Sequence, residues 1–301
     1  MILIKPSFEI IEQESGFEGV LKQIEKVGRT CYKSEDKIKE GSAKKFVDML
    51  TTNCHGAMLE HGTVYLDLPY SLFDTMRHEG LADKYLNNKY SVCVPYTYYF
   101  EEGDVVGINK LAVTTNYRVL VENGWLDDLK YQCEPTKHHK KRITVKFVCD
   151  RGVSHEFVRH RVFSFAQEST RYCNYSKDKF GNAITFIAPC WLNEDDIEIY
   201  EKHISGDSFY KPLPSKITCA GVFYHTLLEC EEAYFILLEN GWKPQEARAV
   251  LPNSLKTELV MTGFIEDWKH FFELRCDTAA HPQARELAIP LQNYFKENGY
   301  I

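Results

Sequence analysis

The sequence lacks the patterns that mark several common classes of protein. Its ten cysteines are scattered singly, and no two of them form the C-x-x-C pair that zinc sites and redox dithiols use. It contains no G-x-G-x-x-G or Walker-type loop, which argues against a Rossmann-type dinucleotide site and against a P-loop. Repeats and low-complexity tracts are also missing. We therefore expect no metal centre, and we expect the cysteines to be reduced thiols in the core.

Long apolar runs and an excess of positive charge are missing too. No run approaches the length of a membrane span, and the first residues lack the pattern of a signal peptide. The net charge is −7, so the molecule as a whole would repel a polyanion. The basic run at 137–142 is short and has no interleaved aromatic residues, which is typical of a solvated loop. The sequence predicts a cytoplasmic protein with neither nucleic acid nor membrane as a partner.

Apolar and aromatic residues are plentiful, at 44% and 13% of 301 residues, which is enough for a sizeable core. Alternation of apolar and polar residues predicts strands at 2–11, 64–68, 96–100 and 143–148. Helical spacing predicts helices at 17–27, at 42–53 with Ser42 as the N-cap, at 72–78, at 150–161, at 214–240 and from about 265 onward. The segment from about 70 to 142 mixes short elements with turn residues and is expected to be an inserted lobe.

The segment 159–172 is the most informative in the chain, because it holds three arginines, a histidine and several hydroxyl groups. Guanidinium groups match phosphate oxygens with two hydrogen bonds and stay charged at any working pH. Val162, Phe163 and Phe165 interleave with the charged residues, so part of the segment is expected to be buried, and a buried arginine needs a partner. An anionic ligand is one such partner. Asp or Glu from elsewhere in the protein is the alternative.

Four further motifs accompany this segment in a fixed order. They are Glu60-His61 before an early strand, Glu246-Ala247-Arg248 leading into Leu-Pro, Leu274-Arg275, and His281 with Gln283. Taken singly, each arginine among them fits an ordinary salt bridge. Together with Arg159-His160-Arg161, followed by seven residues and Ser169, they resemble the motifs of flavin-dependent thymidylate synthases. The resemblance covers about 42–70 and 143–288 and leaves the expected lobe unmatched.

The resemblance implies a role for each matching side chain. Six residues are expected beside the flavin: His61, Arg159, His160, Arg161, His270 and His281. Seven are expected around the nucleotide: Glu156, Gln167, Glu168, Ser169, Arg171, Arg248 and Arg275. Ser169 and Arg275 are the expected catalytic residues. Arginines and a hydroxyl would offset the desolvation of a nucleotide phosphate, and an arginine at the pyrimidine carbonyls would stabilise negative charge that develops on the ring.

The implied reaction is the reductive methylation of dUMP to dTMP, with methylene-tetrahydrofolate as the carbon donor, FAD as the cofactor and NADPH as the electron source. Electrostatic stabilisation replaces a covalent nucleophile in this chemistry, so Cys173 is expected to be a core or spacer residue. The implied fold is α+β, with a mixed or antiparallel sheet and long helices. One domain is expected over 1–301, with an insertion at about 70–142. The implied assembly is a homotetramer with shared sites.

Several positions depart from the family pattern and leave other functions open. The family commonly has Asn-Glu ahead of the serine, where this chain has Ala166-Gln167-Glu168. Phe264 and His270 stand where the family often has flavin-contacting Asn residues, and Glu156 stands where it often has Gln. One alternative is a related flavin- and folate-dependent pyrimidine nucleotide hydroxymethylase. The other is a non-catalytic nucleotide-binding homologue.

Overall fold

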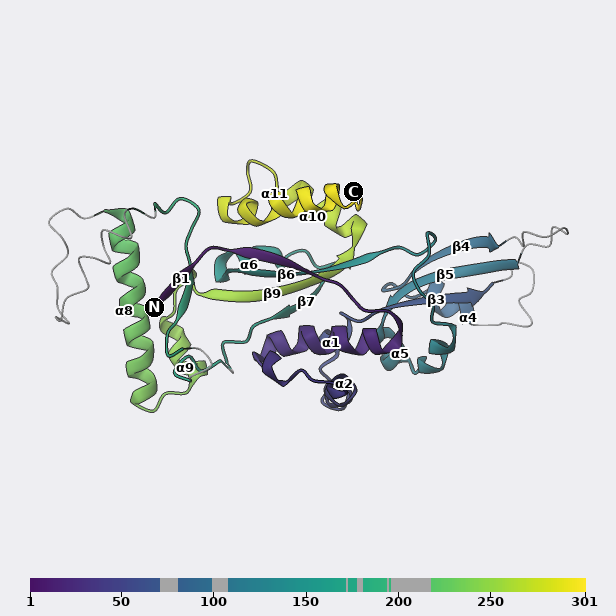
Figure 1. Ribbon diagram of the computed structural model, residues 1–301, viewed down its shortest axis with the longest axis horizontal. Coiled ribbons are helices and arrows are strands. Elements are labelled where there is room, and N and C mark those ends of the chain that lie inside the picture. Colours follow the sequence, from purple (N-terminus) through teal and green to yellow (C-terminus); the bar gives the residue numbers. More distant parts are fainter. Residues whose placement is uncertain (71–80, 99–107, 172, 178–180, 194, 196–217) are drawn as a thin grey trace.

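The computed structural model describes residues 1–70, 81–98, 108–171, 173–177, 181–193, 195 and 218–301. Its centre is a four-stranded antiparallel sheet in the order β2-β6-β9-β7 (Figure 1). The strands are β2 (Ser7–Ile11), β6 (Arg142–Asp150), β7 (Ser164–Gln167) and β9 (Lys256–Phe264). β6 and β9 pair along their whole length, from Arg142 opposite Phe264 to Asp150 opposite Lys256. The fold is therefore α+β with antiparallel pairing, as the sequence predicts.

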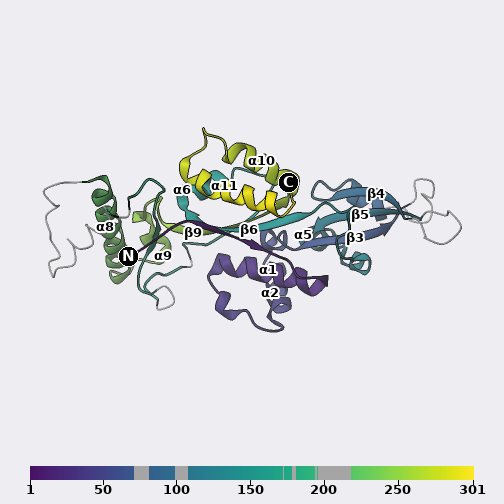
Figure 2. The same cartoon turned by 45° about the horizontal axis from the view of Figure 1, so that its top comes forward.

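Helices cover both faces of this sheet (Figures 1 and 2). On one face lie α6 (Arg151–Phe157), α10 (Ile265–Arg275) and α11 (Pro282–Glu297), and on the other α1 (Gly16–Tyr32), α2 (Ser42–Thr52) and α3 (Gly56–Leu59). Successive strand residues point to opposite faces. Phe147, Leu259 and Met261 thus pack against α10 and α11, whereas Ala166 and Val260 pack toward α1. The same alternation decides on which face each functional side chain of β7 and β9 lies.

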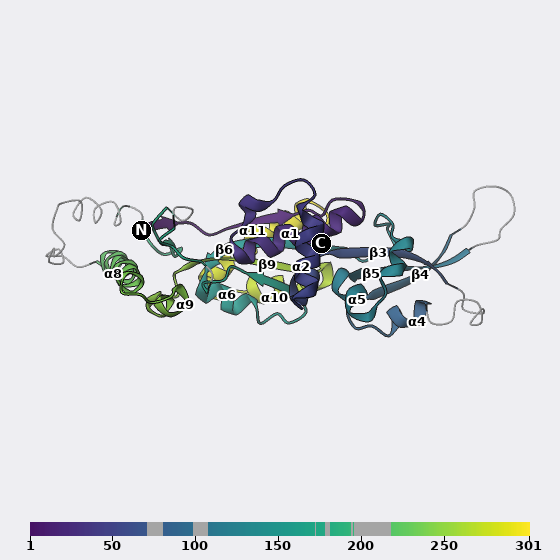
Figure 3. The same cartoon turned by 90° about the horizontal axis from the view of Figure 1, so that it is seen from below.

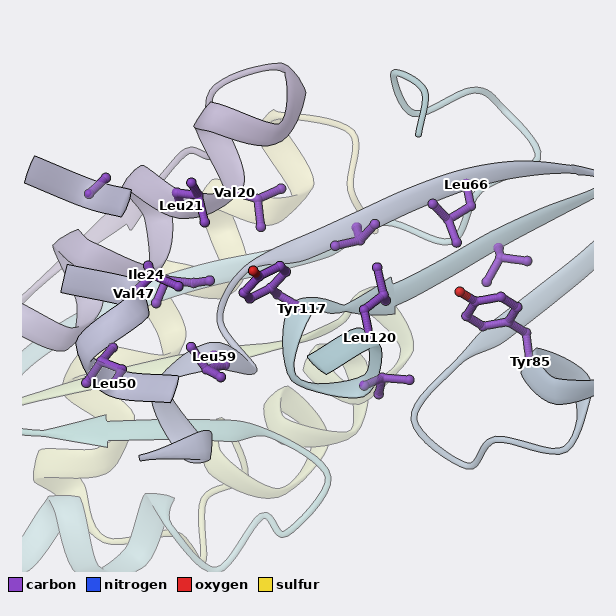
Figure 4. Packing of buried hydrophobic residues seen from close by; sticks show 14 of the residues in the cluster. Val20, Leu21, Ile24, Val47, Leu50, Leu59, Leu66, Tyr85, Tyr117 and Leu120 are labelled. Atoms are coloured by element: carbon purple, nitrogen blue, oxygen red, sulfur yellow. The ribbon is translucent and has the colours of Figure 1, made fainter. Parts of the chain in front are cut away.

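A second antiparallel sheet, β3-β5-β4, forms one end of the molecule (Figures 1 and 3). Its elements are β3 (Thr63–Pro69), α4 (Leu81–Leu86), β4 (Val92–Tyr98), β5 (Ile108–Asn116), α5 (Tyr117–Asn123) and the 3-10 helix η2 (Leu126–Tyr131). The core beneath this sheet is continuous with that of α1 and α2, where Ile24 and Leu50 join Leu66 and Leu120 (Figure 4). The sheet also includes β3, so it starts before residue 70. That the segment 70–142 is an insertion stays a prediction.

The opposite end of the molecule carries a small layer around a long helix (Figure 1). Its elements are β1 (Ile2–Ile4), β8 (Thr185–Ile187), α8 (Cys219–Glu239), α9 (Pro244–Ala247) and the 3-10 helix η4 (Arg248–Val250). β1 and β8 pair in parallel. α8 buries Leu227 and Tyr234, yet Val222 and Ile236 are 46% and 48% exposed. The predicted helix start at Pro214 lies outside the described residues, as does the predicted helix 72–78.

Three predicted boundaries need correction. The strand expected at 2–11 is two strands in different sheets: β1 pairs with β8 and β2 with β6, and Pro6, which has no N–H to donate, lies between them. Ser42 is the first helical residue of α2 and not its N-cap, which is Gly41 at φ 71°. The helix expected at 150–161 ends at Phe157, so the Arg-His-Arg triplet follows the helix. A further short 3-10 helix, η1, spans Glu35–Lys37.

Candidate functional site

The Arg-His-Arg triplet lies in a turn between α6 and β7. α6 begins at its N-cap Asp150, whose Oδ1 accepts a hydrogen bond from the Val153 N–H at 2.7 Å. After the helix, His160 turns inward and is 7% exposed, whereas Arg159 and Arg161 are exposed. Within the described part of the chain, neither of these two guanidinium groups makes an ion pair or a hydrogen bond. The turn therefore presents two unneutralised cations to the solvent.

Arg275, the last residue of α10, connects this turn to α6. Its Nε donates to His160 Nε2 at 2.9 Å, and its terminal nitrogens donate to Glu156 Oε2 at 2.8 Å and to the Glu156 carbonyl at 2.7 Å. Three of the five guanidinium N–H groups are thus occupied, and two remain for a ligand. Burial lowers the pKa of Arg275, and the charge of nearby Arg159 adds to that effect. The guanidinium is fixed in orientation, with the Glu156 carboxylate on it and the charge of Arg159 nearby.

His160 is held as a neutral ring. Because Nε2 accepts the Arg275 hydrogen bond, the ring proton of the neutral form belongs on Nδ1. Burial, together with the charges of Arg275 and His270, lowers the pKa of His160 to about 4. His270 is exposed, and its ring centroid lies 6.4 Å from that of His160. His160 thus combines with Arg275 and Glu156 in one rigid group, with His270 at its edge.

A second group of predicted residues lies where the chain leaves β7. The Ser169 N–H donates to the Cys31 carbonyl at 3.1 Å, which ties this segment to the end of α1. Ser169 Oγ accepts from the Arg171 N–H at 3.4 Å, and Arg248 in η4 donates to Thr170 Oγ1 at 2.8 Å. Both Arg171 and Arg248 are exposed. The structure therefore brings Ser169, Arg171 and Arg248 together around one short segment.

Gln167 and Glu168 point to opposite faces of the sheet. Gln167 Nε2 donates to Ser154 Oγ at 2.9 Å and to Thr257 Oγ1 at 3.2 Å, on the face covered by α6. Glu168 is 3% exposed and accepts from Lys256 Nζ at 2.8 Å on the face covered by α1. The two residues were expected to share a substrate site, but adjacent strand positions alternate in direction. Only Gln167 lies on the side of Glu156 and Arg275.

Glu168 belongs to a group that the sequence analysis missed, which we call the buried charge cluster: Lys33, Glu168, Lys256 and Glu258. Lys256 Nζ bridges Glu168 and Glu258, at 2.8 and 2.6 Å, and Lys33 bonds to Glu258 from the end of α1. Burial opposes the charged form of Lys256, but the two carboxylates outweigh it and raise its pKa. Burial likewise opposes ionisation of Glu258, but the two lysines lower its pKa to about 2. Lys256 and Glu258 are therefore both charged at neutral pH.

His61 lies in the interior and not with the other residues expected beside the flavin. Its ring is fully buried, and Nδ1 lies 2.7 Å from Thr262 Oγ1. Burial and the charge of Arg142 lower the pKa of His61 to about 3. Arg142 donates to Ser164 Oγ and to the backbone carbonyl of Glu60. In this chain His61 has no surface to offer a flavin, and its contacts join α3 to β9.

His281 lies at the N-cap of α11 beside a cavity of about 280 Å³. Its ring centroid is 5.8 Å from that of Trp191, and Glu156 lines the same cavity. Gln283 Nε2 donates to Asp150 Oδ2 at 2.6 Å, while burial raises the pKa of Asp150 despite this bond. The cavity thus connects His281 with the Arg275 group through Glu156. Asp150 and Trp191 were not among the predicted site residues.

The cysteines are free thiols, although not all of them lie in the core. Cys54, Cys190 and Cys219 are exposed, which corrects the expectation that all ten are buried. Cys173 is 1% exposed, and its Sγ donates to Glu168 Oε1 at 3.8 Å. Among the described residues, no group of three potential ligands could hold a metal ion. In that same part of the chain, no helix has the length and apolar character needed to cross a membrane.

Comparison with known proteins places these groups in a family. The sequence model of the family described as thymidylate synthase complementing protein matches residues 128–298, which is more than half of the chain. The chain belongs to this family. The match includes the Arg-His-Arg turn, Ser169, Arg248, Arg275 and His281, but it excludes the early motif with His61.

Individual relatives match over a shorter stretch. A flavin-dependent thymidylate synthase of Geobacter sulfurreducens is 29% identical over 150 residues, which are 48% of this chain and 52% of that protein. Another, of Mycobacterium tuberculosis, is 33% identical over 144 residues, 46% of this chain and 51% of that protein. The chain thus spans about half the length of the curated relatives it matches. One solved structure that aligns with this chain is the UMP/dUMP methylase PolB from Streptomyces cacaoi, bound with 5-Br dUMP. The alignment covers 99% of this chain and 93% of the PolB chain, with 16% sequence identity and a TM-score of 0.42.

Proposed function

We propose that this protein is a cytoplasmic enzyme that reductively methylates dUMP to dTMP. Methylene-tetrahydrofolate would supply the carbon, FAD would serve as the cofactor, and NADPH would supply the electrons. Family membership supports the proposal, since the relatives are named flavin-dependent thymidylate synthases. The observation that carries it is the pair of exposed arginines, Arg159 and Arg161, which have no described counter-ion; Arg159 lies near the fixed guanidinium of Arg275.

The residues of the Arg-His-Arg turn fit an anionic flavin cofactor. FAD carries a diphosphate, and exposed guanidinium groups bind phosphate oxygens through paired, charge-assisted hydrogen bonds. Arg159, Arg161 and the 65% exposed side chain of Val162 together offer charge and an apolar contact in one turn. Bound there, the flavin would supply hydride chemistry. His61 is not part of this set, because it is fully buried.

Arg275 is the best-placed side chain to stabilise charge on the nucleotide. Glu156 and His160 fix its plane, and its two remaining N–H groups would bind the pyrimidine oxygens where negative charge develops. Glu156 accepts hydrogen bonds from the terminal nitrogens of Arg275 and would act as its positioning partner. His160, with a pKa near 4, accepts a hydrogen bond from Arg275 without adding a competing positive charge.

Arg171, Arg248 and Ser169 would bind the nucleotide phosphate. They surround one segment after β7 and offer two exposed guanidinium groups and a hydroxyl. Cys173 would not act as a nucleophile, because it is buried beside the carboxylate of Glu168. A thiolate there would face an adjacent negative charge. The proposed chemistry therefore depends on arginines and not on an enzyme thiol.

We further propose that the active assembly is a homotetramer with shared sites. The candidate nucleotide residues form two groups, each with its own partners: Arg275 of α10 bonds to Glu156 of α6, and Arg248 of η4 bonds to Thr170 in the segment after β7. A second copy could bring its Arg248 group to the Arg275 group of the first. α8 also exposes Val222 and Ile236, and Trp242 follows at 48% exposure. These apolar side chains offer a surface that another copy would cover.

Product analysis tests the reaction. The protein would be incubated with dUMP, methylene-tetrahydrofolate, FAD and NADPH. The nucleotides would then be separated and identified by their masses in a mass spectrometer. We expect dTMP, and none when either FAD or methylene-tetrahydrofolate is omitted. A hydroxymethyl nucleotide as the sole product would replace the proposal by the hydroxymethylase alternative. Binding of FAD and dUMP without any conversion would favour the non-catalytic homologue.

A further inference from the structure

The buried charge cluster connects three elements that are far apart in the sequence. Lys33 is the C-cap of α1, Lys256 and Glu258 lie on β9, and Glu168 directly follows β7. Lys33 and Glu258 are 225 positions apart. Lys256 and Glu258 are two residues apart on one strand, so their side chains share the face that Glu168 also occupies. The cluster thus pins the end of β7 to β9 and to the end of α1.

Lys256 is the member on which the others depend. It is the one lysine of the cluster that contacts both carboxylates, and its side chain is only 15% exposed. Glu168 and Glu258, at 2% and 12% side-chain exposure, would lose the cation that lies between them. Removing one partner of a buried ion pair leaves an uncompensated charge, which is far more disruptive than losing an exposed pair. Without Lys256, Glu168 would be driven out of its position.

The backbone around Glu168 carries this constraint into the candidate site. The Glu168 N–H donates to the Glu258 carbonyl at 2.8 Å, and the Ser169 N–H donates to the Cys31 carbonyl at 3.1 Å. Side chain and backbone are therefore anchored at the same place. The next residues are Thr170, which holds Arg248, and Arg171. Any displacement of Glu168 moves the start of this segment.

We infer that Lys256 is a positioning residue: by holding Glu168, it fixes the segment 169–171 in the geometry that binds a nucleotide phosphate. The identity of the ligand rests on the proposed function, whereas the tether itself does not. Lys256 touches neither nucleotide nor flavin in this scheme. Its effect should therefore reach the phosphate contacts and spare the Arg-His-Arg turn.

Lys256→Met tests the inference, with Lys146→Met as the matched control. Lys146 lies on the neighbouring strand β6 and pairs with Glu9 at 2.9 Å on the same face of the sheet, away from the segment 169–171. Lys256→Met should raise the Kd for dUMP about tenfold, the equivalent of one lost phosphate contact. It should leave the Kd for FAD unchanged. Lys256→Arg should restore dUMP binding, and Lys146→Met should change neither constant.

Hydrogen–deuterium exchange of the ligand-free protein gives an independent readout. The amides of Glu168 and Ser169 should exchange faster in Lys256→Met than in the wild type or in Lys146→Met. Unchanged exchange would overturn the tether, and faster exchange with unchanged dUMP affinity would overturn the positioning role. Equal losses of dUMP and FAD binding would also overturn it. A wild type that never binds dUMP would refute the proposed function, while the exchange result would still stand.

Lys33→Met keeps the inference testable if Lys256→Met does not fold. Lys33 sits at the outer end of the cluster and is 17% exposed, so its loss leaves Lys256 between the two carboxylates. We expect the same direction of change, with a smaller rise in the Kd for dUMP and with FAD binding retained. A folded Lys33→Met variant with wild-type dUMP affinity and wild-type exchange at 168–169 would contradict the inference.

Discussion

Acid should destabilise this protein through His61, and the effect can be isolated by one substitution. The ring is fully buried, and its pKa in the folded protein is about 3, against an ordinary value of 6.5. Below pH 6.5 the unfolded chain binds a proton at His61, while the folded protein does not. The stability that the neutral ring contributes is therefore complete above pH 6.5 and is lost progressively as the pH falls toward 3. Raising the pH restores it.

Linkage gives the size of the effect. Between pH 7.5 and pH 5, a histidine with these two pKa values lowers the free energy of unfolding by about 2 kcal/mol. His61→Asn removes the titrating ring and keeps a polar group where Nδ1 meets Thr262. The variant will be less stable at every pH, because a buried ring is lost. Its stability should nevertheless fall by about 2 kcal/mol less than that of the wild type over this pH range.

Urea unfolding of the wild type and of His61→Asn at pH 7.5 and pH 5 gives the change in the free energy of unfolding with pH for each protein. The prediction concerns the difference between these two changes. Other titrating groups, including His160, are present in both proteins and cancel. His155→Asn is the control, because His155 is an exposed histidine of α6. It should follow the wild-type pH dependence. Parallel pH dependence in the wild type and in His61→Asn would refute the argument, since it would mean that His61 is protonated alike in both states.

The remaining predictions concern the proposed site and the assembly. Arg171→Ala and Arg248→Ala should each weaken dUMP binding about ten- to a hundredfold and leave FAD binding nearly unchanged, measured by calorimetric titration; equal losses for both ligands would contradict the assignment. Cys173→Ala should retain substantial turnover in a dTMP assay, and a folded variant that binds both ligands yet shows no turnover would reinstate a covalent thiol mechanism. Light scattering should give a homotetramer, and a stable monomer that converts dUMP would show a self-contained site.

Local patterns predicted the elements whose signals are themselves local. β6 was predicted from alternation, because one face packs on α10 and α11 and the other toward α1. The start of α10 after Phe264 followed from helical spacing, and its end at Arg275 placed that residue as expected. The end of α6 at Phe157 could not be predicted in this way. Phe157 packs edge-on against Phe271, which is more than a hundred residues away, and helical spacing does not reveal such a contact.

The site was predictable in its residue types and less so in its geometry. The motif order identified Arg159, Arg275 and Arg248 as residues of interest, but it could not separate them into two groups. Strand alternation would have separated Gln167 from Glu168 had β7 been assigned from the sequence. The role of Lys33 could not be predicted from the sequence, because its partner Glu258 is 225 positions away. A lysine that follows a helix usually has its charge in water. His61 was matched by motif, and only the packing revealed that it is enclosed.

The opposite directions of Gln167 and Glu168 constrain how this chain can evolve. Phe163 is held close under Gly263, where an added Cβ would lie 2.5 Å from the Phe163 ring, so the chain enters β7 at a fixed point. Inserting or deleting one residue between Phe163 and Ser169 would turn Gln167 toward Lys256 and Glu168 toward Ser154. Both side chains would then lose their partners at once. Natural variation in this stretch should therefore preserve its length.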